Sequence, residues 1–332
     1  MNYPLPISLL QKLSGRLRYP ALTVGLALLV LLITLYSATG ALFPDQDLYG
    51  YDSRMQVTGQ FLVFTLTPPY LLACLIGQAG ATPGIIAALS PLLPYDQRTS
   101  LGQLDQIRYW HVGVLIGVAN ALLFNVPWSI LSFTVRDSLF VFSLTMVFAQ
   151  LLTWAVVGLL LAWALHNALL LYHIGRFVKV DLFHLDALNP FGQSALRSLL
   201  IVVGALAITP LQAIDQEFRW VNYQNAVVVG IPAMLLLTLV PIWSVHQQIR
   251  ASKREELHRI DVEIASSSRD LGTGALTRLN ALLDRRRHVL QLRNWPMDVS
   301  LFSRIVLYVL IPPLAWAGAA LVELAVDSYL AG

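Results

Sequence analysis

The chain has 332 residues, of which 56% are hydrophobic and only 12% are charged, with a formal net charge of +3. Soluble proteins carry about a quarter charged residues, so this composition excludes an ordinary soluble domain. The single cysteine, Cys74, excludes a disulfide framework or a cysteine-based metal cluster within one chain.

Long apolar stretches recur along the whole length and predict an all-α, polytopic transmembrane bundle of about seven spans. In chain order, they are residues 20–43, 59–79, 110–133, 138–171, 198–214, 225–245 and 304–326. The first is longer than the apolar core of a signal peptide, so we expect it to be retained as a span. The fourth is about twice as long as a span needs to be, and we expect it to project from the bilayer.

A short apolar stretch at residues 84–93 follows the second span. Ten residues are too few to cross a bilayer, and Pro83, Pro91 and Pro94 bracket the stretch. Because proline interrupts helices, the pattern predicts a separate interfacial or re-entrant turn.

The basic residues predict the orientation of these spans. With the N-terminus in the cytoplasm, 19 of the 22 Lys and Arg residues fall inside, which gives a net charge of +8 inside and −5 outside. This asymmetry is the positive-inside pattern. It favours a multi-pass protein of a cell membrane, typical of a bacterial cytoplasmic membrane, with the C-terminus outside and with anionic lipids at the inner leaflet. The positive charge therefore does not predict a nucleic-acid partner.

Small residues and proline pairs mark particular spans. Gly113, Gly117 and Ala121 repeat every four residues on the third span, which permits close helix contact, either inside the bundle or at a dimer seam. Proline pairs at residues 68–69 and 312–313 predict kinks within two other spans.

Residues 246–296 form the largest polar segment, between the sixth and seventh spans. Apolar residues at helical spacing on either side of a Gly-Thr-Gly break predict a cytoplasmic hairpin of two amphipathic helices. The sequence thus divides into a six-span region at 1–245, this basic hairpin at 246–296, and the final span with an outer C-terminus at 297–332.

The narrow apolar stripes of the hairpin need a surface to cover them. We expect a protein partner or a second copy of the chain to use these residues. The predicted partner-binding side chains are Leu257, Ile260, Ile264, Leu276, Leu279 and Leu283. The adjacent cluster of Arg285, Arg286 and Arg287 predicts contact with anionic lipid.

Two weaker groups of polar residues offer alternatives. Ser143 and Gln150 make a polar stripe on the fourth span that is compatible with a pore. The second group follows that span and contains imidazole and carboxylate groups of the kind that bind zinc or iron. Its members are His166, His173, Asp181, His184 and Asp186.

No nucleophile elbow, phosphate-binding loop or dinucleotide fingerprint occurs in the sequence. We therefore expect a non-enzymatic membrane component without a cofactor and without catalytic residues: a scaffold, accessory subunit or signal transducer that engages a cytoplasmic partner through the hairpin. The alternatives are a homo-oligomeric channel or passive pore, and a membrane-embedded metal-dependent enzyme acting on a lipid.

Overall fold

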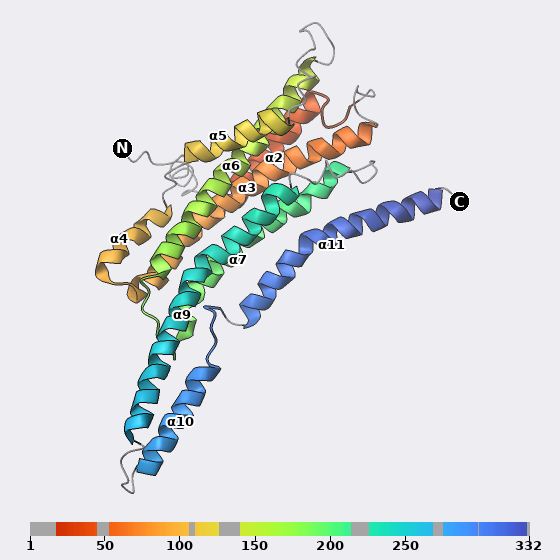
Figure 1. The fold of residues 1–332 in the computed structure, drawn as a ribbon. Coiled ribbons are helices and arrows are strands. Elements are labelled where there is room, and N and C mark those ends of the chain that lie inside the picture. The colour runs from red at the N-terminus through yellow and green to blue at the C-terminus, as the bar shows by residue number, and fades with distance from the viewer. Residues whose placement is uncertain are drawn as a thin grey trace.

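The computed structural model describes residues 18–44, 53–105, 110–125, 140–213, 226–267, 275–297 and 299–330, and within these ranges all regular structure is helical. Long helices lie side by side in an elongated bundle, and a helical extension projects from one end of it (Figure 1). The all-α prediction is confirmed for this part of the chain.

Six helical segments are long and apolar enough to cross a membrane. Their main helices are α2 (Pro20–Ala38), α3 (Arg54–Leu89), α6 (Phe140–Gly175), α7 (Asn189–Ile208), α9 (Ile231–Ser267) and α11 (Val299–Leu330). They coincide with six of the seven predicted spans, as expected for a multi-pass membrane protein.

The predicted third span is only partly described. Its first part forms α5 (Trp110–Asn120) and the π-helical turn η4 (Ala121–Asn125), which together are apolar but shorter than the six long segments. Residues 126–133 of this span lie outside the described residues, so a count of seven stays a prediction.

Helix α3 differs from the sequence expectation. It continues through Pro83 as one helix to Leu89, followed by the 3₁₀ turn η1 (Ser90–Leu92), where a separate interfacial or re-entrant turn was expected. Leu89 and Leu93 are buried in the main core. Burial of such side chains offsets the free-energy cost of a proline inside a helix. The local sequence around Pro83 does not reveal this burial.

Helices α6 and α9 both exceed the length of a span. The 36 residues of α6 and the 37 residues of α9 correspond to about 55 Å each, against a hydrocarbon core of about 30 Å. The predicted length of the fourth span is confirmed. Helix α9 is continuous from the sixth predicted span into the predicted hairpin, so no loop separates these two parts.

The second helix of the hairpin, α10 (Ala275–Gln291), packs against the distal part of α9. Figure 1 shows these two helices extending together from one end of the bundle. We call residues 246–267 of α9 together with α10 the arm. A hairpin of two packed helices is thus present, whereas its cytoplasmic location stays a prediction.

Glycines bring α5 and α6 into close contact. A Cβ atom built on Gly158 of α6 would lie 2.1 Å from the carbonyl oxygen of Gly113, and one built on Gly117 would lie 2.0 Å from the carbonyl oxygen of Trp154. The small-residue face predicted on the third span therefore packs inside the bundle, where backbone meets backbone.

We predict that Gly158→Ala destabilises the protein by about 1–3 kcal/mol, because the added methyl group forces two backbones apart. Chemical or thermal unfolding in detergent measures the change. Gly80→Ala is the matched control, since a Cβ atom built on Gly80 of α3 meets nothing within 4 Å. Equal stability of the two variants would contradict the close contact.

Candidate functional sites in the arm and in the bundle

The main apolar core of the bundle continues into the arm. Ile260 of α9 and Leu282 and Val289 of α10 are buried, and Leu257 and Ile264 pack against the same core. Three of the six predicted partner-binding residues, Leu257, Ile260 and Ile264, therefore contribute to packing within the structure. They hold α10 in place on α9.

Ion pairs reinforce the contact between the two helices. Glu256 is 2.7 Å from both Arg259 and Arg285, and Arg286 is 2.8 Å from Asp261. Two of the three arginines that the sequence assigns to anionic lipid thus bind carboxylates of α9. The third, Arg287, is exposed and lies 3.8 Å from Asp284 of its own helix.

An apolar stripe on α10 is exposed. Leu276, Leu283 and Leu290 show 72%, 39% and 48% of their surface. The spacing of seven residues places them on one face of the helix, two turns apart. We call them the leucine stripe. Leu276 and Leu283 belong to the predicted partner-binding set, half-buried Leu279 lies between them, and Leu290 extends the stripe by two turns.

Lys253 of α9 fixes the end of α10. Its Nζ donates to the carbonyl oxygens of Leu290 and Leu292, at 3.1 and 2.8 Å, and to Oδ1 of Asn294, at 2.9 Å. Carbonyl groups at a helix C-terminus lack partners within the helix, and a lysine is a suitable donor for them. The cap therefore joins the end of α10 to the middle of α9.

The segment between α10 and α11 makes one further contact with α9 and one with the bundle. The ring of His246 stacks on Trp295 with centroids 4.2 Å apart, and its Nδ1 donates to the Asn294 carbonyl at 2.7 Å. Arg293 pairs with Asp186 at 2.6 Å. These contacts set the position of the arm relative to the bundle.

The predicted metal-binding residues do not gather at one point. Asp181 and His184 are 2.8 Å apart, and the Phe183 N–H and the His184 ring lower the pKa of the Asp181 carboxyl. His173 contacts Phe177, and Asp186 pairs with Arg293. Across the described residues, His166 included, no group of three His, Cys, Asp or Glu side chains could hold a metal ion.

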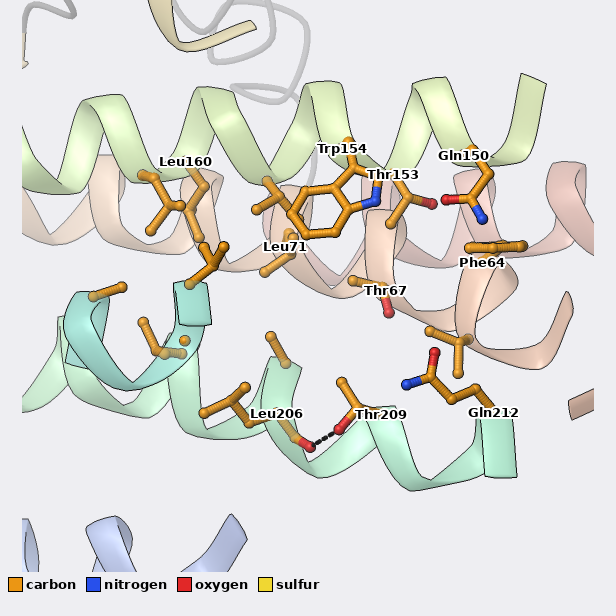
Figure 2. Close-up of a pocket in the computed structure, with 18 of the residues that line it drawn as sticks. Phe64, Thr67, Leu71, Gln150, Thr153, Trp154, Leu160, Leu206, Thr209 and Gln212 are labelled. Carbon is orange, nitrogen blue, oxygen red and sulfur yellow. Dashed lines mark hydrogen bonds between the residues drawn. The ribbon is translucent and has the colours of Figure 1, made fainter. Parts of the chain in front are cut away.

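A cavity of about 310 Å³ lies between α3, α6, α7 and the start of α9. Figure 2 shows Gln150, Thr153 and Trp154 of α6 facing Phe64 and Thr67 of α3 across it. The floor comes from α7, from the 3₁₀ turn η7 (Thr209–Ala213) and from the π-helical turn η8 (Ala226–Gly230). Its size falls within the range of small-molecule sites.

The two predicted pore residues have different surroundings. Gln150 lines the cavity, whereas Ser143, two turns earlier on α6, is buried and is not among the described residues that line it. The signal for Gln150 was an amide in an apolar span. The threonines of the cavity were not predicted, because threonine is common in membrane helices, where it bonds to its own backbone.

Comparisons with protein-family models, with curated proteins and with solved structures found no match to this chain. No relative therefore supplies a function by analogy. We infer the function from the side chains of the arm and the cavity.

We predict that Lys253→Met loosens the last turn of α10 by about 1–3 kcal/mol, because it removes the donor to the terminal carbonyl groups. Hydrogen exchange of backbone amides, read by mass spectrometry, measures this opening. Arg254→Met is the control, since Arg254 is an exposed neighbour on the same helix. Unchanged exchange in the Lys253 variant would show that the cap does not hold the arm.

Proposed function

We propose that the protein is a non-enzymatic, multi-pass membrane component that binds a cytoplasmic protein through the leucine stripe of α10. The exposure of Leu276, Leu283 and Leu290 along one helix face carries this proposal. Exposed apolar patches of this kind mark interaction surfaces. A scaffold, an accessory subunit or a signal transducer would all use such an arm.

The charge of the arm supports a cytoplasmic location. Its described part between Arg250 and Arg293 contains nine Lys or Arg residues and five Asp or Glu residues. Basic loops stay on the cytoplasmic side of a membrane. In this orientation the N-terminus is cytoplasmic and the C-terminus is outside. We propose that the membrane is the bacterial cytoplasmic membrane.

The length of α9 supports a position of the stripe outside the lipid. About 20 residues of helix are enough to cross a bilayer, and α9 continues well beyond that length. We therefore propose that the arm extends away from the bilayer surface and that lipid does not cover the stripe. A protein surface is the remaining cover for three exposed leucines.

The flanks of the stripe indicate the chemistry of the partner. Leucine at every seventh position is the pattern of a helix that packs lengthwise against another helix. Helix α10 carries four arginines and one aspartate, and Arg287 beside the stripe is exposed. We therefore expect the partner to present an amphipathic helix with an apolar stripe and acidic flanks.

The two alternative functions gain less from these observations. The channel hypothesis has Gln150 in a cavity, but Ser143 lies apart from it. The lipid-enzyme hypothesis depends on five residues of which Asp181 and His184 form the one close pair. Both stay predictions without a specific observation in their favour.

We predict that a photoreactive amino acid at position 283 crosslinks to an acidic, amphipathic segment of another protein in the native membrane. The same group at position 262 is the control, because Val262 is also exposed, at 55%, but lies on α9. The change Leu276→Glu, two turns away, reduces the crosslink at 283 by about tenfold or more, since burying a leucine contributes about 1.5–3 kcal/mol.

Three outcomes would contradict this function. Equal crosslinking at 283 and 262 would mean that the stripe is not a specific surface. A crosslink to lipid would mean that the arm lies on the bilayer. A crosslink to a second copy of the chain would replace the heterologous partner by a homo-oligomer.

A further inference from the structure

Two threonines of the cavity differ from the other threonines of the bundle. Thr65, Thr145 and Thr238 each donate the hydroxyl to the carbonyl four residues earlier in their own helix, at 2.6–2.8 Å. Thr67 and Thr153 are 6% and 7% exposed. Within the described part of the chain, their hydroxyl oxygens have no hydrogen-bond partner.

These hydroxyl groups come from two helices and enter one space. Thr67 belongs to α3 and Thr153 to α6, and both line the cavity (Figure 2). A buried hydroxyl without a partner is destabilising, and lipid offers no water to satisfy it. Both groups line the same cavity, although each could have bonded to its own helix, as expected for a ligand site.

The same stretch of α3 has backbone carbonyl groups that can accept further hydrogen bonds. Pro68 and Pro69 have no backbone N–H, so the carbonyl groups of Phe64 and Thr65 lose the donors that a regular helix gives them. On the floor of the cavity, a carbonyl group that also lacks its backbone donor because of a proline accepts hydrogen bonds from side chains. Pro210 cannot bond the Leu206 carbonyl, which instead accepts from the Thr209 hydroxyl at 2.7 Å and the Trp316 indole at 3.3 Å.

The walls of the cavity are fixed by close contacts. The Tyr70 hydroxyl of α3 donates to the Leu200 carbonyl of α7 at 3.0 Å. A Cβ atom on Gly204 would lie 2.0 Å from that hydroxyl, so glycine is required for the approach. This contact therefore fixes the distance between α3 and α7 beside the cavity.

The lining of the cavity is more polar at one end than at the other. Figure 2 shows Gln150, Thr153, Thr67 and Gln212 toward one end and Leu160 at the other. The apolar end is completed by Val157, Leu161 and Val202. None of the described lining residues carries a charge. A charged ligand would have no counter-charge there, and burying it would be costly.

We infer that this cavity binds a neutral amphiphile, with a hydroxyl or carbonyl head at Thr67 and Thr153 and an apolar tail toward Leu160. Such a molecule partitions into the bilayer and reaches the cavity from lipid. Trp154 supplies an indole N–H and Gln150 an amide beside the head, so the site offers both donors and acceptors. This inference is independent of the leucine stripe.

The test uses the full chain in phosphatidylcholine nanodiscs and a decanol analogue that carries a diazirine on its chain. After illumination, mass spectrometry locates the labelled residues. Labels are expected on cavity residues of α3 and α6, and unlabelled decanol is expected to compete with them. Decanoate and decylamine, at a pH where both are charged, are expected to compete at least about tenfold more weakly, because a buried charge is unpaired there.

Variants separate the cavity from general lipid contact. Thr67→Val combined with Thr153→Val keeps the shape and removes both hydroxyls, and should weaken competition by decanol by about tenfold. Thr65→Val is the matched control, because Thr65 is buried on the same helix with its hydroxyl bonded to Phe61. Ala205→Phe fills the space and should abolish cavity labelling.

Four results would overturn the inference: labels spread evenly over lipid-facing residues, charged probes that compete as well as decanol, equal loss in the Thr65 control, or labelling that persists in a well-folded Ala205→Phe protein. Size-exclusion elution identifies any variant that fails to fold. In that case the probe series on the unaltered chain decides, because it needs no substitution.

Discussion

The continuity of helix α9 is the constraint on which the rest of the arrangement depends. One helix of 37 residues passes from the bundle into the arm without a loop. Near the middle of α9, Ser244 lies close to the end of α6, where Gly175 leaves room for the approach. Further along, His246 stacks on Trp295, and Lys253 caps α10. Because these contacts share one continuous helix, the position of α10 depends on the packing of the spans.

The same helix connects the two candidate sites. Ala233, in the first turn of α9, lines the cavity, and Lys253 holds the distal helix of the arm. A ligand that changes the packing around Ala233 would therefore act on the helix against which α10 and its leucine stripe pack. Helix α9 thus contacts both candidate sites, and each site stands on its own contacts.

Hydropathy and charge made much of the fold predictable, because lipid imposes length and polarity on every span. The extension of α3 through Pro83 was not predictable, since it depends on the burial of Leu89 and Leu93 by residues distant in sequence.

Helical spacing identified both stripes of the arm. It did not separate Ile260, which packs against α10, from Leu283, which is exposed, because periodicity does not say which face meets which neighbour. Gln150 was found by its polarity. Thr67 and Thr153 were not, because only the structure distinguishes a threonine bonded to its own helix from one that is not.

Native mass spectrometry of the protein extracted gently from its own membrane measures whether the arm binds a partner. We expect a defined complex with a different protein, which is lost when Leu276 and Leu283 are both changed to Glu and kept when Val262 is changed to Glu. A monomer, a homo-oligomer, or a complex that is indifferent to the stripe would contradict the assignment of the arm as a partner-binding element.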